Sequence, residues 1–303
     1  MTSIWWVLWS LWVPLRPLGT DSLTLPHSTV FSPSGTLYAE LQGGVLQLYI
    51  RGIKQEVLEI HDPTVLGVTL SDSGDLVFLR SDGSQGAQLE AQSLRGTPRW
   101  TLRVPPVLGL RFSQDSRWLL VLTSQGLYRF SRQGELRGRY PVAPVYQAWG
   151  PWVALAQGFT VSLYRDTTLL WEVPLGMNRV RALYFRPPAP QLLIFTARQM
   201  ILLDSTGTTE RTLVLPGEYQ AGTLGPHGPI VSGRLSDGLG VYWWDPHRAG
   251  FHSLLKFRPH RIGQRIWISA MGLWGDTLWI LQNAKVLRYQ VLWPSGGGDH
   301  AGP

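Results

Sequence analysis

A pattern repeated seven times constrains the fold of this 303-residue chain more than any other feature. In each copy an apolar stretch ends in an aromatic residue or Leu, a short polar or Gly/Pro turn follows, and a second stretch begins. The copies start 36 to 49 residues apart, at Phe31, Leu70, Phe112, Trp149, Phe185, Leu224 and Leu273. A period of about 40 residues with four short strands in each unit is typical of propeller blades.

The order of strands within one unit supports this interpretation. The second unit predicts strands at 66–70, 76–79, 87–91 and 99–102, and the fifth at 180–185, 192–195, 200–203 and 211–215. The second strands are nearly continuous apolar runs, at 118–122, 192–195 and 278–281, which indicates burial on both faces. We therefore predict an all-β fold, a seven-bladed β-propeller of four-stranded antiparallel blades. A jelly roll or a stacked sandwich would not account for seven spaced copies.

The two ends of the chain predict how the ring closes. The last unit has room for three strands before the chain ends, and residues 22–25 form an apolar stretch that belongs to no hairpin. We predict that this N-terminal strand completes the last blade, which would hide an exposed strand edge. The expected organisation is an apolar Trp-rich segment at 1–20, one propeller domain at 21–293 and a flexible tail at 294–303.

The N-terminal segment leaves localisation open. Residues 4–15 form an apolar run of the length of a signal-peptide core, shorter than the roughly 20 residues of a membrane-spanning helix. No Lys or Arg precedes the run, and no cleavage site of the usual small-residue type follows it. Export, membrane anchoring through residues 4–15 and a cytoplasmic location all stay open.

Composition and motifs point away from most catalytic chemistry. The chain has no cysteine, which excludes disulfides, thiolate nucleophiles and Cys-ligated metals. It also lacks the common nucleotide, metal and hydrolase motifs. We expect the acidic residues to stabilise turns by binding nearby backbone amides; they are Asp72, Asp75, Asp82, Asp115, Asp166, Asp204, Asp237 and Asp276. We therefore predict no catalytic, cofactor-binding or metal-binding residue, although a ring of acids at one mouth of the channel would reopen the question.

The turns between predicted second and third strands are polar in every unit. Gly after Gln or Asp suits tight hairpins that need positive φ. In a propeller these turns share a face with the connections between blades, so they form a candidate rim of the channel face. Its residues are Gln42, Asp82, Gln125, Gln157, Arg198, Asp237 and Gln282.

A basic segment at 245–265 precedes the last unit. Closely spaced Arg side chains favour carboxylate or phosphate groups. We therefore predict a candidate site for an anionic partner here, with 258–265 joining blades six and seven on the channel face. Its residues are Arg248, Lys256, Arg258, His260, Arg261 and Arg265. A solvated long loop is the alternative interpretation.

The turns after the third strands resemble a known group of propellers. The segments 93–100, 131–140, 165–173 and 204–213 follow a pattern of a polar turn, often with Gly, and then Trp or a β-branched strand. Trp244 and Asp245 stand at the end of a predicted third strand, where WD-repeat blades carry a Trp-Asp pair. The chain thus resembles WD-repeat, YVTN and quinoprotein-like propellers over residues 22–291. The resemblance implies a fold and no activity.

These features favour a noncatalytic scaffold that binds a protein or peptide. The excess of basic residues, a net charge of +7, is compatible with an acidic partner, and nucleic acid is not favoured. The expected form is a monomeric ring without a cofactor. Two alternatives stay open: a small-molecule hydrolase of the propeller lactonase type, and a propeller component of the cell envelope.

Overall fold

The computed structural model describes most of the chain between residues 28 and 291. The described ranges are 28–34, 36–42, 45–50, 53–59, 64–82, 86–187, 190–225, 228–245, 250–258, 267–274, 277–282 and 285–291. Within these ranges the secondary structure is entirely β, with strands numbered β1 to β27 and no helix. The described residues accordingly include no helix of the length and apolarity needed to cross a membrane.

The described strands form seven antiparallel sheets, each with its strands side by side in chain order. Sheets one to three comprise β1 (Ser28–Phe31), β2 (Leu37–Gln42), β3 (Val45–Ile50), β4 (Ile53–Glu59); β5 (Val65–Leu70), β6 (Asp75–Ser81), β7 (Ala87–Ser93), β8 (Pro98–Val104); and β9 (Val107–Phe112), β10 (Trp118–Thr123), β11 (Gly126–Ser131), β12 (Leu136–Tyr140). Sheets four and five comprise β13 (Val145–Trp149), β14 (Trp152–Gln157), β15 (Thr160–Arg165), β16 (Thr168–Pro174); and β17 (Val180–Arg186), β18 (Gln191–Thr196), β19 (Gln199–Leu203), β20 (Thr209–Val214). Sheets six and seven comprise β21 (Glu218–Gly225), β22 (Gly228–Leu235), β23 (Gly238–Asp245), β24 (Gly250–Phe257); and β25 (Ile268–Trp274), β26 (Thr277–Gln282), β27 (Lys285–Gln290).

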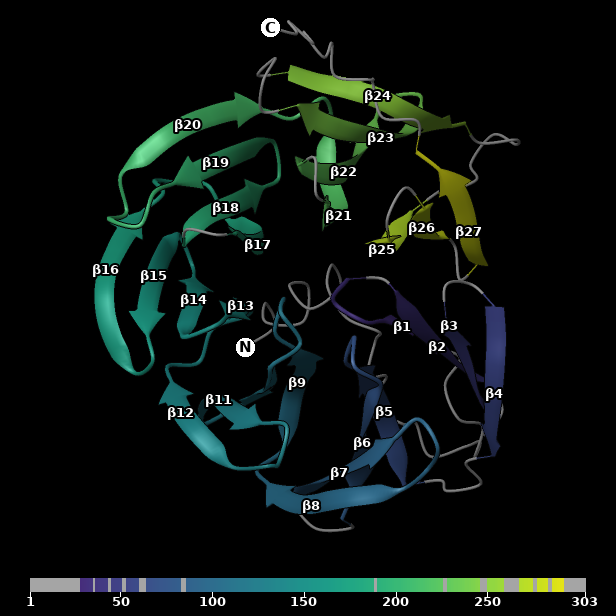
Figure 1. Cartoon of the computed structure of the whole chain (residues 1–303). Coiled ribbons are helices and arrows are strands. Elements are labelled where there is room, and N and C mark those ends of the chain that lie inside the picture. The colour runs from purple at the N-terminus through teal and green to yellow at the C-terminus, as the bar shows by residue number, and fades with distance from the viewer. Residues whose placement is uncertain are drawn as a thin grey trace, which may run out of the picture.

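The sheets are arranged as blades around a central axis, as Figure 1 shows. The first strand of each sheet is innermost, and the innermost strands of neighbouring sheets lie against one another, as β5 does against β9 and β21 against β25. The first and last sheets are also neighbours, because β1 contacts β25. The predicted all-β propeller is therefore confirmed.

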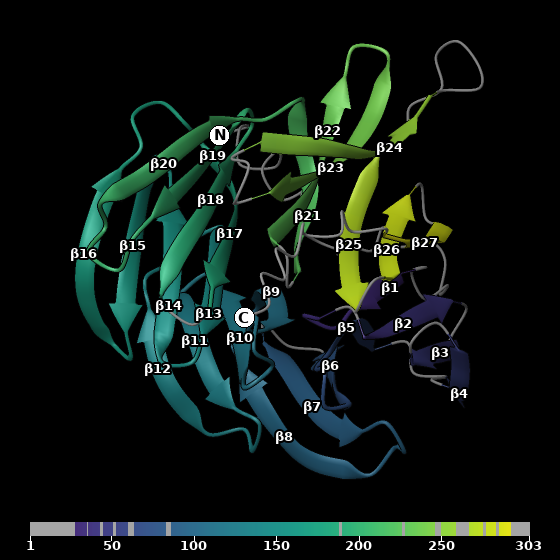
Figure 2. The ribbon, with the colours of Figure 1, turned by 45° about the horizontal axis from the view of Figure 1, so that its top comes forward.

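The predicted strands lie where the sequence pattern placed them. The expected strands of the second and fifth units match β5 to β8 and β17 to β20 to within about two residues. The apolar second strands are buried on both faces; in β10 and β18 all but the first residue are inaccessible. Burial on both faces follows from the packing of each blade between two others, which Figure 2 shows from a tilted direction.

The last sheet has three strands among the described residues, β25, β26 and β27. The predicted fourth strand at 22–25 lies outside the described residues, as do the segments 1–20 and 294–303. Closure of the ring by an N-terminal strand therefore stays a prediction.

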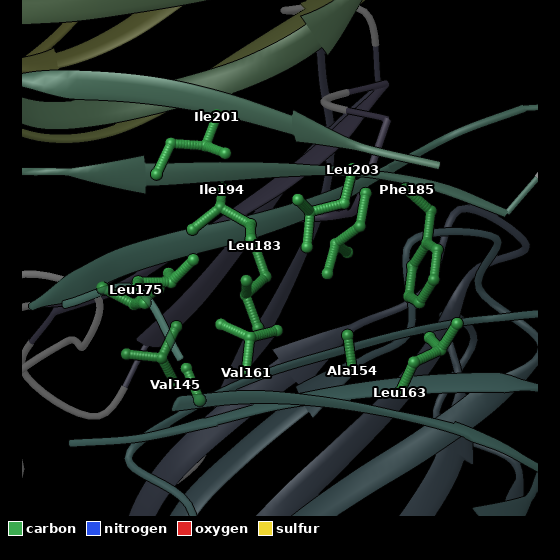
Figure 3. Close-up of a cluster of buried hydrophobic side chains, with 13 residues drawn as sticks. Val145, Ala154, Val161, Leu163, Leu175, Leu183, Phe185, Ile194, Ile201 and Leu203 are labelled. Atoms are coloured by element: carbon green, nitrogen blue, oxygen red, sulfur yellow. The ribbon is translucent and has the colours of Figure 1, made fainter. Parts of the chain in front are cut away.

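Apolar cores fill the spaces between neighbouring blades. Between sheets four and five, Val161 of β15 and Ala154 of β14 belong to the same buried cluster as Leu183 of β17 and Ile194 of β18. Figure 3 shows these side chains pointing toward one another across the two sheets. Because each blade shares its core with its neighbours, each sheet is stabilised mainly by the next one along the ring.

A second kind of contact links blades two to five at their outer strands. The indole of Trp100 in β8 donates a hydrogen bond to the Arg132 carbonyl of sheet three, with an Nε1–O distance of 2.7 Å. Tyr140 of β12 donates in the same way to the Asp166 carbonyl of sheet four. Trp171 of β16 donates to the Ser205 carbonyl of sheet five at 3.0 Å. In each case an aromatic residue of the fourth strand binds the turn between the third and fourth strands of the following blade.

Glycines allow two of these contacts to form. Gly134 and Gly207 occupy the receiving turns of sheets three and five, with φ of 82° and 86°. A Cβ atom at either position would lie only 2.9 Å from the nearest indole atom, of Trp100 or Trp171 respectively. These positions explain the recurrent combination of turn glycine and Trp: the glycine provides both the positive φ and the space for the ring.

The expected role of acidic residues in turns holds at several positions. Asp204 accepts hydrogen bonds from the amides of Thr206 and Thr208 at 2.8 and 2.9 Å. Asp72 instead bridges blades, because it accepts bonds from Ser34 of sheet one and Ser116 of sheet three.

Asp75 differs from the prediction for a turn residue. It is the first residue of β6, and its buried carboxylate lies 2.6 Å from Arg132 Nε and 2.5 Å from an Arg99 terminal nitrogen. The interpretation of Asp75 as a residue that caps backbone amides was wrong. The fourth strand of its own sheet and the turn of sheet three converge there and bring two guanidinium groups to it.

Candidate functional site

The predicted rim residues occupy equivalent positions in the seven sheets. Each stands at or beside the turn between the second and third strands, as Arg198 does between β18 and β19. Because strands alternate in direction, these turns lie at the same end of the sheets as the connections from one sheet to the next. We call this end the connection face. The rim residues follow one another around it, one for each blade, and do not gather at a single point.

The exposure of the rim side chains differs between blades. Four of them are exposed, namely Gln125, Gln157, Arg198 and Asp237, whereas Asp82 and Gln282 are half-buried. Gln42 ends β2, and its side chain lies outside the described residues. A rim of amide, acid and guanidinium groups offers hydrogen bonds to a ligand.

The basic segment divides into a strand and a connection. Residues 250–257 form β24, the outermost strand of sheet six, and Lys256 and Arg258 are exposed at its connection-face end. Strands of eight residues in sheet six account for part of the long interval before the last unit. The other candidate residues of this segment lie outside the described residues: Arg248, His260, Arg261 and Arg265.

Exposed apolar side chains at the connection-face end of blades four and five were not predicted. Met177, in the connection between β16 and β17, is 92% exposed, and Phe159, in the turn between β14 and β15, is 48% exposed. Val214, the last residue of β20, is 74% exposed. We call these three residues the blade four–five patch. The sequence signal for it was an apolar residue directly after a Gln-Gly turn, at Phe159, and a Met in an otherwise polar connection.

Hydrogen bonds fix the backbone beneath the patch. The Leu175 amide donates to the Phe159 carbonyl at 2.7 Å, which ties the connection of blade four to its turn. The Leu215 amide donates to the Arg198 carbonyl at 2.8 Å, which does the same in blade five. The patch is therefore carried by backbone segments that are held to the sheets rather than by free loops.

Basic side chains accompany the patch. Arg179 follows Met177 in the same connection, Arg198 stands in the neighbouring turn, and Arg139 is exposed at the end of β12. At this end of blades four and five the acid is Glu172, which accepts a bond from Ser162 at 2.9 Å; blade six adds the acids Glu218 and Asp237 and the bases Lys256 and Arg258. The local charge balance therefore favours a negatively charged partner surface.

Metal chemistry has no support in the described part of the chain. Among the described residues, no three His, Asp or Glu side chains lie close enough together to hold a metal ion. Burial raises the pKa of several tyrosines, among them Tyr146 and Tyr219. It raises the pKa of Tyr140 to about 12.

Comparisons with known proteins show similarity in structure and not in sequence. No protein-family model matches the chain, and no curated protein matches it. Hsv2 from Kluyveromyces lactis superimposes with a TM-score of 0.67 at 10% identity, over 90% of this chain and 94% of that one. A chain of the mitotic checkpoint complex superimposes with a TM-score of 0.64 at 14% identity, over 90% and 92% of the two chains.

The third similar structure is BamB from Moraxella catarrhalis, with a TM-score of 0.52 at 12% identity, over 88% of this chain and 98% of that one. At such low identity these likenesses bear on the fold and not on activity. Together with the seven sheets and the Trp-Asp pair that ends β23, they identify the fold of this chain as a WD-repeat-like β-propeller.

Proposed function

We propose that this chain is a noncatalytic propeller that binds an acidic protein segment on the connection face, over the blade four–five patch. The observation that carries the proposal is the exposure of Met177 and Phe159 at the same end of blades four and five as the exposed side chains of Arg179 and Arg198. Exposed apolar side chains within a polar, charged rim are characteristic of protein interaction sites.

Two further observations support this choice of partner. The exposed basic side chains of Lys256 and Arg258 stand at the connection face too, at the end of sheet six. The net charge of the chain is +7. A basic face steers an acidic partner toward it and sets the orientation of the complex. One structure that resembles this fold comes from a multiprotein assembly, the mitotic checkpoint complex.

The test compares two substitutions of exposed apolar residues. Met177→Asp places a negative charge in the patch, whereas Leu136→Asp places one on the outer strand β12, where Leu136 is 55% exposed. Both side chains are solvent-accessible, so neither change should alter folding. Partners captured by the tagged parent chain are identified, purified and titrated against the three proteins by calorimetry.

We expect Met177→Asp to weaken binding at least about tenfold, and binding to weaken further as salt is raised. Leu136→Asp should bind like the parent chain. Equal affinity of the parent and both variants would refute the assignment of the patch, and the absence of any partner for the parent chain would refute the binding function itself.

A further inference from the structure

An arginine near the axis of the ring lacks an anionic partner. Arg111 lies on β9, the innermost strand of sheet three, and its guanidinium carbon is 4.5 Å from the centre of the Tyr146 ring on β13. The Nε atom of Arg111 is buried and has no hydrogen-bond acceptor. Among the described Asp and Glu residues, none forms an ion pair with Arg111.

The next three blades each carry a tyrosine that interacts electrostatically with this charge. Tyr146 is only 2% exposed, and its hydroxyl oxygen is buried without a hydrogen-bond partner. The hydroxyl groups of Tyr184 on β17 and Tyr219 on β21 lie 3.4 Å apart, and Tyr184 also donates to the Gly222 carbonyl at 2.7 Å. The charge of Arg111 acts on all three phenols. The innermost strands of sheets three to six therefore carry one cation, a phenol ring stacked on it, and two further phenols within electrostatic range of it.

The electrostatics of this cluster are those of an incomplete site. Burial lowers the pKa of Arg111 from its ordinary value, which expresses the cost of holding its charge away from water. Burial also raises the pKa of Tyr146, Tyr184 and Tyr219, so these phenols are neutral at pH 7 and keep their hydroxyl protons. Arg111 as a whole is half-buried, while its Nε atom is fully buried. A cation that is largely withdrawn from water is normally paired, and an anion would supply the missing partner.

Arg129 shows what a completed arginine site looks like in the same blade. It is 2% exposed, and its guanidinium carbon lies 4.7 Å from the centre of the Trp118 ring. Its Nε atom also lacks an acceptor, but its terminal nitrogens bind the Pro151 carbonyl and the Asp166 carboxylate, both at 3.2 Å. Both arginines stack on an aromatic ring, but only Arg129 has oxygen acceptors among the described residues, a carboxylate and a carbonyl, on its terminal nitrogens.

We propose that Arg111 and Tyr146 form an anion-binding site at the axis of the propeller, which takes a small molecule with a carboxylate or phosphate group. The guanidinium group binds the oxyanion through its terminal nitrogens and Nε, because its planar fork matches two oxygens. The Tyr146 hydroxyl donates a further hydrogen bond. This site is distinct from the blade four–five patch and does not depend on it.

The experiment measures how anions stabilise the purified full-length chain. Urea unfolding is followed in chloride, inorganic phosphate and succinate at equal ionic strength, for the parent chain, Arg111→Met and Arg129→Met. Binding to the folded state alone raises the folded-to-unfolded ratio about 100-fold at an anion concentration of about 100 times Kd. Phosphate also stabilises proteins nonspecifically. Arg111→Met measures that contribution, and Arg129→Met controls for the loss of a buried arginine elsewhere in the same blade.

We expect phosphate or succinate to raise the folded-to-unfolded ratio of the parent chain and of Arg129→Met at least about tenfold more than that of Arg111→Met. The anion that gives the larger effect identifies the ligand as a phosphate or a carboxylate. Equal responses of the parent chain and Arg111→Met, or no specific response of the parent chain to either anion, would overturn the proposal.

A second readout needs no ligand. In chloride, Arg111→Met should be at least as stable as the parent chain, because it removes an unpaired charge from a half-buried side chain whose Nε atom has no acceptor among the described residues. Arg129→Met should be less stable, because it leaves Asp166 and the Pro151 carbonyl without their partner. If Arg111→Met lost as much stability as Arg129→Met, Arg111 would be a structural residue that stacks on Tyr146, and the proposed site would be refuted.

Discussion

The contact between Gly134 and Trp100 can be tested by adding a single methyl group. Gly134→Ala would place a Cβ atom 2.9, 3.1 and 3.2 Å from the Cδ2, Cγ and Cε3 atoms of Trp100. Optimal carbon contacts are about 3.5–4.0 Å, so the ring must move by several tenths of an ångström. That movement strains the hydrogen bond from Trp100 to Arg132. Overpacking of this kind costs about 1–3 kcal/mol, in addition to about 1 kcal/mol for a non-glycine residue at positive φ.

Gly96 provides a matched control. It occupies the equivalent turn of sheet two, with φ of 75° against 82° for Gly134, and a Cβ atom there would meet nothing within 4 Å. Gly96→Ala should therefore cost about 1 kcal/mol, the backbone contribution alone, whereas Gly134→Ala should cost about 2–4 kcal/mol. Both free energies are measured by urea unfolding under conditions where the transition is reversible.

A double-mutant cycle isolates the contribution of the ring. In the Trp100→Ala background the indole is absent, so Gly134→Ala should cost no more than Gly96→Ala does in the parent chain. If Gly134→Ala and Gly96→Ala destabilised the parent chain equally, or if the cost at Gly134 were unchanged without Trp100, the contact between ring and turn would have no role in selecting glycine.

Three further substitutions test contacts between blades. Asp75→Asn should lower the free energy of unfolding by about 2 kcal/mol, because the half-exposed arginines beside it lose a charged acceptor; an unchanged urea midpoint would contradict this. Gln114→Leu should lower the free energy of unfolding by a similar amount. The side-chain oxygen of Gln114 accepts a bond from the backbone N–H of Phe185 at 2.8 Å, and its side-chain nitrogen donates to the Phe185 carbonyl at 2.6 Å. Tyr140→Phe should flatten the alkaline loss of stability, since the Tyr140 pKa is about 12 in the folded chain and about 10 when unfolded. The contribution of the neutral Tyr140 phenol to the free energy of unfolding is fully present below pH ~10 and is lost toward pH ~12. Parallel pH profiles of the unfolding free energy for Tyr140→Phe and the parent chain would refute this prediction.

The elements that the sequence predicted are those with local causes. A second strand such as β10 is recognisable because burial on both faces leaves only apolar residues in it. Turn residues such as Gly96 and Asp204 act within a few positions of themselves, through positive φ or bonds to adjacent amides. Such features recur in several blades, and the recurrence itself indicated the ring.

Features that depend on partners from other blades were not predictable in the same way. Asp75 was assigned to its own turn because Arg99 and Arg132, which bind it, are distant in the sequence. The cluster at the axis was missed for the same reason, although Arg111, Tyr146, Tyr184 and Tyr219 lie 35, 38 and 35 residues apart. That spacing matches the repeat and was the available signal. The exposure of Met177 depends on how blades four and five meet, which a local pattern does not specify.

The one-way pairing of outer strands has a consequence for how this ring can be rearranged. Tyr140 ends sheet three, but its acceptor, the Asp166 carbonyl, belongs to sheet four. A blade excised at the boundaries of its sheet would carry the donor away from its acceptor and would bring an acceptor for a missing Trp100. A module that keeps these hydrogen bonds when it is duplicated, deleted or transplanted therefore starts at the fourth strand of one sheet. It ends at the turn between the third and fourth strands of the following sheet, so its boundaries do not coincide with those of a sheet.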